Sequence, residues 1–366
     1  MKLLKKSYFL ISLILVILIA FAPEGRVVHG QDENPTDPTS GAPEDTVKVF
    51  LPMLRHSDYV PPSYNSPFII DHNAVSLFER IPSRYLTSAR NLRLLFSDRS
   101  VGQNINDALN CLTAPSWSES APSCRRDYYN ANWQWKLYTQ SDLDQGLVPA
   151  RIRFVPSPTL YNRSNWTFEF RQGTWSELTQ DFIQNLAPAY INSKDVLSYQ
   201  FSYLNVDEDD DINDPNFGFW ANSSSRYDIH DLEAFWARYP NKTFFLWTTS
   251  LARSIGTKVS TDFNDRMRQY AIQNQVILFD VADIESYTDK GTPCFDNRDG
   301  VQYCDQNTGR CENYANDGRN YPAICQDYTT EIDAGHLGSV SAGKIRIAKA
   351  FWVLMARIAG WDGVSP

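Results

Sequence analysis

The sequence predicts an α/β protein whose core is a mostly parallel, five-stranded sheet with helices on both faces. Two observations favour this class. Short apolar runs alternate along the chain with segments that carry apolar residues at helical spacing, which is the pattern of repeated strand–helix units. A strand at 92–96 is followed at once by a helix at 101–112, so the pattern opens with such a unit. The length of 366 residues suits one large domain or two small ones.

The N-terminus has the layout of a secretory signal peptide. Three lysines within the first six residues precede an apolar run at 8–22. We therefore expect residues 1–30 to be a leader that is removed on export. An uncleaved membrane anchor is the alternative, and the run is shorter than the roughly 20 apolar residues of a spanning helix. Any contact with a membrane is expected only through this leader.

Three further parts follow the leader. Residues 31–46 are rich in proline, acidic residues, threonine and glycine, so we expect a disordered linker. Residues 47–90 are interpreted as an N-terminal extension that packs on the main domain, helical in part over 75–90 and interrupted at Pro82. The main domain is expected over 91–362.

The first strand of the sheet is expected at 92–96, an apolar run bounded by polar residues. The helix at 101–112 follows because Val101, Ile105, Ala108, Leu109 and Leu112 fall on one side of a helix. A second strand is expected at 151–155, where prolines end it, then an amphipathic helix at 175–186 and a third strand at 199–204.

The second half continues the alternation. A helix at 228–239 ends before a proline and leads into an apolar strand at 243–248. A helix at 261–274 leads into the fifth strand at 276–280. The last helix is expected over 341–359, where apolar residues recur at helical spacing. Strands that alternate with helices in this way form a parallel sheet, and a ligand then binds beyond the carboxyl ends of the strands.

The six cysteines are even in number, which indicates disulfides in an exported protein: Cys111, Cys124, Cys294, Cys304, Cys311 and Cys325. A bridge between the first two would close a short loop. The last four lie in a polar excursion at 285–330, and the sequence leaves their pairing open. A zinc site is disfavoured, because no Cys-x-x-Cys spacing occurs and no histidine lies among them.

The composition bears on partners. The formal net charge of −9 argues against a nucleic-acid partner, which would favour a basic face. Aromatic residues make up 13% of the chain, which suits a surface that stacks on sugars as well as a large core. Four tryptophans are candidates for either role: Trp133, Trp135, Trp166 and Trp175.

No metal or cofactor is expected. Two acidic stretches, 207–214 and 296–300, are interpreted as solvated loops, with calcium loops as the alternative because oxygen ligands are dense there. Neither stretch has the full spacing of an EF-hand. A metal-dependent hydrolase is disfavoured because histidine is too sparse for a typical site.

Two distant segments together predict a nucleophile and its base. The turn 97–102 follows the first strand and offers a serine at the start of a helix, where backbone N–H groups are available to an oxyanion. We expect Ser100 to be the nucleophile, with Ser97 as the alternative. The loop 331–338 carries His336, and Asp333 three residues earlier is expected to orient its ring.

These two segments resemble motifs of the SGNH/GDSL hydrolase superfamily. The resemblance implies a three-layer, flavodoxin-like α/β/α fold and the activity of an esterase, lipase or polysaccharide deacetylase. It places the nucleophile at Ser100 and the Asp-x-x-His pair at Asp333 and His336. The oxyanion hole would combine the backbone N–H of Ser100 with Gly173 and Asn205. The family's Gly-Asp-Ser differs here, because one extra residue separates Asp98 from Ser100.

The sequence therefore predicts a secreted or cell-surface serine esterase that cleaves a small-molecule or glycan ester through an acyl-enzyme. The alternative is a non-catalytic glycan-binding or cell-surface protein on a degenerate scaffold of the same kind. In that case the tryptophans, and not the serine, would carry the function.

Overall fold

The structure is a computed structural model that describes residues 67–364, except 255, 301, 306–307 and 314. The expected leader, the linker and the residues of the extension before 67 lie outside the described residues. All described elements belong to the compact unit His56–Pro366. No helix within the described part of the chain is long and apolar enough to cross a membrane.

The core is one sheet of six strands in the order β1-β8-β7-β6-β2-β5, and every pairing in it is parallel. The strands are β1 (Ile69–Ile70), β2 (Leu94–Asp98), β5 (Trp166–Phe170), β6 (Val196–Tyr199), β7 (Thr243–Trp247) and β8 (Ile277–Phe279). The prediction of a parallel sheet is confirmed. The sheet has a sixth strand because the two residues of β1 pair with the edge of β8.

The prediction of a strand at 151–155 is wrong. A 3-10 turn, η3 (Ala150–Ile152), occupies this stretch, and β5 takes the place beside β2 instead. Trp166, Phe168 and Phe170 alternate with polar residues in β5, as in a strand that is covered on one face. The strand expected at 199–204 is displaced, because β6 ends at Tyr199 and the chain then turns into η5 (Tyr203–Asn205).

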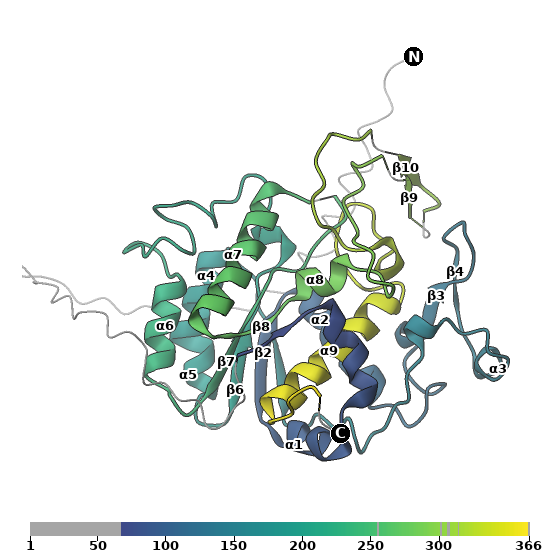
Figure 1. The fold of residues 1–366 in the computed structure, drawn as a ribbon, viewed down its shortest axis with the longest axis horizontal. Helices are drawn as coiled ribbons and strands as arrows, with labels where there is room; N and C mark the ends of the chain where they lie inside the picture. The colour runs from purple at the N-terminus through teal and green to yellow at the C-terminus, as the bar shows by residue number, and fades with distance from the viewer. Residues whose placement is uncertain (1–66, 255, 301, 306–307, 314, 365–366) are drawn as a thin grey trace, which may run out of the picture. The chain divides into compact units, whose positions relative to one another are not determined.

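Helices cover both faces of the sheet (Figure 1). On one face lie α1 (Ser83–Asn91), α2 (Ser100–Leu112) and α9 (Ala342–Ile358), and on the other lie α4 (Trp175–Asp181), α6 (Ile229–Ala237) and α7 (Lys258–Asn274). The side chains of β2 alternate between the two layers. Leu94 and Phe96 join the core under α9, whereas Leu95 joins the core under α4 and α7.

Local sequence explains where several helices begin. Thr174 and Glu177 form a capping box at the start of α4, and Asp228 caps α6 in the same way with Asp231. The helix expected at 175–186 continues past α4 as a π-helical turn, η4 (Phe182–Leu186), and a short α5 (Ala187–Tyr190). The remaining elements are η1 (His72–Arg80), η2 (Pro122–Cys124), α3 (Gln140–Asp144), α8 (Val281–Ser286) and η6 (Gln326–Tyr328).

Three disulfides connect the six cysteines: Cys111–Cys124, Cys294–Cys325 and Cys304–Cys311. The first confirms the expected short loop and ties the end of α2 to η2. The other two lie in the excursion, where β9 (Gln302–Cys304) pairs antiparallel with β10 (Cys311–Asn313). A second hairpin is built from β3 (Arg126–Tyr128) and β4 (Trp135–Leu137). The disulfides fit an extracellular protein.

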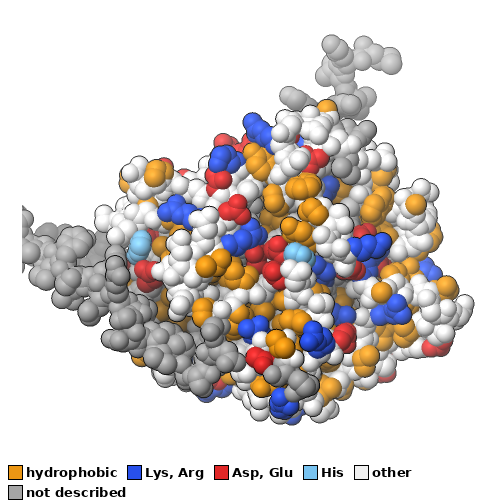
Figure 2. Space-filling view, in the orientation of Figure 1, with side chains coloured by type: hydrophobic (Ala, Val, Ile, Leu, Met, Phe, Trp, Pro, Cys, Tyr) orange, Lys and Arg blue, Asp and Glu red, His pale blue; other side chains and the backbone are white. Residues whose placement is uncertain are grey.

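The face drawn in Figure 2 carries acidic and basic side chains that are interspersed, and neither sign gathers into one large patch. Two of the four tryptophans proposed for stacking are core residues. Trp166 is 6% exposed and Trp175 is 2% exposed, whereas Trp133 and Trp135 are partly exposed on the hairpin β3–β4.

Candidate active site

Ser100 lies where β2 passes into α2. The strand ends at Asp98, and Ser100 is the first residue of the helix. This tight turn depends on Gly102, because a Cβ there would lie 2.5 Å from Cβ of Asp98 and 2.8 Å from the ring of Phe168. Ser97, the alternative nucleophile, is a buried residue inside β2.

His336 contacts Ser100 across 236 positions of sequence. Its Nε2 lies 2.8 Å from Ser100 Oγ, within the reach of a hydrogen bond. The other ring nitrogen, Nδ1, lies 2.8 Å and 3.0 Å from the two carboxylate oxygens of Glu331. A carboxylate on Nδ1 keeps the proton there, so the Nε2 lone pair can accept the proton of the serine hydroxyl.

The carboxylate that orients His336 is Glu331, and the prediction of Asp333 is wrong. Glu331 also accepts the backbone N–H of His336 at 2.8 Å, so one side chain fixes both the ring and the backbone. Asp333 lies on the surface, where its carboxylate pairs with Arg310 at 2.8 Å and its side chain is 59% exposed. The sequence offered one signal for the correct residue, namely a second acid two positions upstream in the same loop.

Packing of the loop explains why Glu331, and not Asp333, reaches His336. A Cβ on Gly335 would lie 2.0 Å from the carbonyl oxygen of Leu251, so the loop presses its backbone against the segment after β7. The N–H of Arg253 donates to the carbonyl of Ala334, and the hydroxyl of Ser254 donates to the carbonyl of Asp333. These contacts fix the backbone at 333–335 and leave the Asp333 side chain outside.

Two further hydrogen bonds hold His336 at the nucleophile. The backbone N–H of Leu337 donates to Asn104 Oδ1 on α2 at 2.8 Å, so the helix that carries Ser100 also anchors the His336 loop. Thr329 Oγ1 donates to the carbonyl of His336 at 2.8 Å. The ring of Tyr203 meets the imidazole edge to face, with centroids 5.9 Å apart.

The carboxylate of Glu331 raises the pKa of His336 above its ordinary value, chiefly through the hydrogen bond to Nδ1, while partial burial acts in the opposite direction. A base with a raised pKa accepts a proton more readily, which favours removal of the hydroxyl proton of Ser100. Ser100, His336 and Glu331 therefore have the geometry that can activate a serine hydroxyl.

Gly173 and Asn205 meet at the same edge of the sheet. β5 and β6 flank β2 on either side, so the segments that follow the three strands emerge together. Asn205 Nδ2 donates to the carbonyl of Gly173 at 3.1 Å, and Asn205 Oδ1 accepts the N–H of Ser202. The η5 turn that holds Asn205 also holds Tyr203, the residue packed against His336.

Two buried acids, Asp98 and Glu285, were not predicted from the sequence as members of the site. Asp98 is 2% exposed, and burial raises its pKa to about 7 against the opposing N–H groups of Arg99 and Gly102. Glu285 on α8 is 1% exposed, and burial raises its pKa well above the usual range, while the N–H of Leu251 donates to it at 2.7 Å. Strand and helix propensity carry no signal for such a pair.

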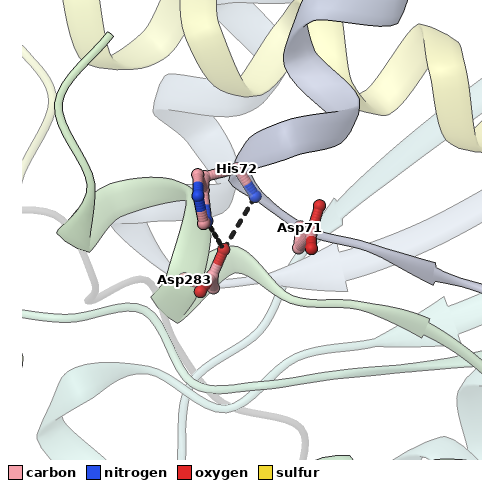
Figure 3. Close-up of side chains that lie close together, drawn as sticks. All are labelled: Asp71, His72 and Asp283. Atoms are coloured by element: carbon pink, nitrogen blue, oxygen red, sulfur yellow. Dashed lines mark hydrogen bonds and ion pairs between the residues drawn. The ribbon is translucent and has the colours of Figure 1, made fainter. Parts of the chain in front are cut away.

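A second histidine–carboxylate pair lies beyond β1 and β8 (Figure 3). His72 Nδ1 lies 2.5 Å from Asp283 Oδ1, which also accepts the backbone N–H of His72 at 2.7 Å. Asp71 is adjacent and caps η1 by accepting the N–H groups of Asn73 and Ala74. The imidazole stacks on Tyr287 at 3.9 Å between centroids.

Asp71, His72 and Asp283 are the group in the described residues whose ligand atoms lie close enough to hold a metal ion. Their hydrogen bonds already use Asp283 Oδ1 twice and Asp71 as a helix cap, so the arrangement is explained without an ion. Within the described ranges, the acidic stretches 207–214 and 296–300 do not form such a group.

The fold and site define a class: an α/β protein with a serine, a histidine and a glutamate joined beyond the carboxyl ends of a parallel sheet. Comparison of the chain with protein-family models, with curated proteins and with solved structures gives no significant match in any of the three. The resemblance to SGNH hydrolases therefore stays a prediction.

Proposed function

We propose that the protein is a serine esterase of the SGNH type that acts outside the cell through an acyl-enzyme. The observation that carries this proposal is the distance of 2.8 Å between Ser100 Oγ and His336 Nε2, with Glu331 on the opposite ring nitrogen. The disulfides and the leader-like N-terminus support an extracellular site of action.

The reaction has two steps. Ser100 Oγ attacks the carbonyl carbon of the ester while His336 Nε2 takes the hydroxyl proton, and the C–O bond to the alcohol then breaks. His336 returns that proton to the departing alcohol. A water molecule, deprotonated by His336, attacks the acyl-enzyme, so the carboxylic acid leaves and Ser100 regains its proton.

The developing oxyanion needs donors that are already in place. Ser100 is the first residue of α2, so its backbone N–H is not used within the helix and supports this role. Asn205 supports it too, because one N–H of its amide is engaged by Gly173 and the amide has a second. Glu331 holds the imidazole in position and stabilises the imidazolium formed in each step.

Labelling with a fluorophosphonate probe tests the proposal, because the probe reacts only with activated serines. We expect the full chain to be labelled once, and Ser100→Ala to abolish the labelling. Ser97→Ala is the matched control from the same turn, and it should still be labelled if it folds. An unlabelled wild type, or equal labelling of Ser100→Ala, would contradict the proposal and favour the alternative of a non-catalytic glycan-binding protein.

A further inference from the structure

The hairpin β3–β4 presents aromatic side chains on the face that adjoins the His336 loop. Tyr128 and Trp135 are paired across the two strands, so their side chains leave the same face of the hairpin. Trp133, in the connecting turn, packs edge to face on Tyr128 with centroids 5.2 Å apart. The guanidinium of Arg126 lies 5.2 Å from the ring centroid of Trp135.

Hydrogen bonds fix this aromatic face next to the active site. The hydroxyl of Tyr128 donates to the carbonyl of Thr329 at 2.8 Å, and the hydroxyl of Thr329 donates to the carbonyl of His336 at 2.8 Å. Arg126 and Ser341 exchange two hydrogen bonds at the start of α9. The aromatic face is therefore two hydrogen bonds away from the histidine that contacts Ser100.

The conformation of Trp133 is unusual for a bulky residue. Its φ is 58°, in the left-handed region that glycine and asparagine favour. This backbone conformation costs about 1–3 kcal/mol for a residue other than glycine, and such strained positions cluster at sites of function. Trp133 and Trp135 also remain partly exposed, whereas Tyr128, on which Trp133 packs, is 4% exposed.

We propose that the partly exposed rings of Trp133 and Trp135, supported by the buried Tyr128, form a carbohydrate subsite that holds the sugar of an acylated glycan while Ser100 attacks its ester. Flat aromatic rings suit the apolar faces of sugar rings, and they leave the hydroxyl edges to polar groups. Asn130, Asn132 and Gln134 are exposed around the turn and carry amide groups, of which the side-chain oxygens of Asn130 and Gln134 accept hydrogen bonds inside the turn. The inference rests on the proposed esterase function.

The test compares two substrates and follows their ratio. A panel of O-acetylated xylan-, mannan-, pectin- and chitin-type oligosaccharides is assayed beside p-nitrophenyl acetate, which has no sugar. We expect Trp135→Ala and Trp133→Asn to lower the ratio of kcat/KM for the best glycan to kcat/KM for the phenyl ester by about tenfold or more. Asparagine is chosen because it tolerates the left-handed backbone at position 133.

Two controls keep the test specific. Trp236→Ala removes a tryptophan of similar exposure from α6, on the opposite helix layer, and should leave the ratio within about twofold. Trp135→Tyr keeps an aromatic ring and should restore most of the ratio. An unchanged ratio in Trp135→Ala and Trp133→Asn, or an equal loss in Trp236→Ala, would overturn the subsite.

Binding separates this inference from the esterase proposal. If the wild type is not labelled by fluorophosphonate, the esterase proposal fails. The same glycans, with their acetyl groups removed, can still be titrated against the wild type and Trp135→Ala with tryptophan fluorescence as the readout. Binding that Trp135→Ala weakens by about tenfold or more would keep the subsite, and the absence of binding by the wild type would overturn it.

Discussion

Among the described residues three histidines pair with a carboxylate through Nδ1, the third being His230 with Glu233, and the pairs at His336 and His72 differ in what meets the far ring nitrogen, Nε2. His336 is held by Glu331 on Nδ1 and contacts Ser100 through Nε2. His72 is held by Asp283 on Nδ1, but its Nε2 has no hydrogen-bond partner among the described residues. Both rings are also packed against a tyrosine.

Under the proposed function, a carboxylate alone does not make a histidine catalytic, because both histidines have one. The carboxylate holds Nδ1 in both places, at 2.5 Å in the His72 pair and at 2.8 Å in the His336 pair, so a carboxylate contact alone does not distinguish them. What differs is the third residue. The turn between β2 and α2, which depends on Gly102, places Ser100 at Nε2 of His336, and His72 has no such partner among the described residues. In the proposed function, Ser100 is therefore what distinguishes the His336 pair from the His72 pair.

Replacement of each histidine is the strongest way to break the comparison. We expect His336→Ala to lower kcat for a simple ester by about 10⁴-fold or more, as expected when the general base of a serine enzyme is lost. His72→Ala should change kcat by less than about threefold, although it removes packing against Tyr287. Steady-state kinetics of the two variants test this prediction, and a thermal melt of each confirms that it is folded.

An equal loss of activity in both variants would contradict the assignment. It would mean that the second pair takes part in the reaction, or that each change disrupts the fold. The thermal melts separate these outcomes, because only the second lowers the Tm in step with the activity.

The two acids of the His336 loop allow a finer test. Glu331→Gln keeps the shape of the side chain but removes the charge that fixes the tautomer, so we expect kcat to fall by about 10²–10⁴-fold. Asp333→Asn is the matched control two positions away, and it should lose only an exposed ion pair with Arg310. A large loss in Asp333→Asn with little change in Glu331→Gln would restore the prediction made from the sequence.

The alternation of strands and helices and the meeting of Ser100 with His336 could be predicted from the sequence. Ser100 could be predicted because a buried strand, a turn with glycine and an amphipathic helix follow each other within about twenty residues. His336 could be predicted because it lies in a loop with glycine immediately before the last helix. Both predictions used local pattern, and local pattern is what a single sequence records.

The partner of His336 could not be predicted in the same way. Glu331 and Asp333 stand in one loop, and the choice between them depends on how Gly335 packs against Leu251, a contact between residues 84 positions apart. The strand β5 was missed for a related reason. Its Trp and Phe residues alternate with polar ones, and only its pairing with β2 distinguishes it from a surface segment.

The proposed oxyanion donor Asn205 is expected to give the next largest effect, and its replacement sharpens the difference between the two pairs. We expect Asn205→Ala to lower kcat by about 100–1000-fold with a smaller change in KM, because an oxyanion donor acts mainly in the transition state. Ser202→Ala is the matched control, since it removes the hydroxyl that caps η5 while leaving the amide of Asn205 in place. A similar loss of kcat in both variants would indicate that η5 is only structural.

The smallest effect is a dependence on pH that the two histidine pairs do not share. Because Glu331 raises the pKa of His336, the neutral base forms only above the ordinary histidine value of about 6.5. We expect kcat/KM to rise with pH through a midpoint above 6.5. The midpoint should move down in Glu331→Gln, and the residual activity of that variant is enough to locate it. His72→Ala should leave the midpoint in place, and a shift there would contradict the separation of the two pairs.

Stability should change with pH in the opposite direction to activity. Burial raises the pKa of Asp98 to about 7, the nearby Arg99 acts in the opposite direction, and the charge of Asp98 in turn helps to raise the pKa of Glu285. The folded state therefore binds the proton more tightly than the unfolded chain does, so this contribution to stability is complete below about pH 4 and is lost as the pH rises to about 7. Urea unfolding at several pH values should show this fall in the wild type and a smaller one in Asp98→Asn. A slope that is equal in the two proteins would mean that Asp98 is not the group that holds the proton. The expected difference would show that the folded protein loses the stability contributed by Asp98 as the pH rises, while His336 becomes the neutral base.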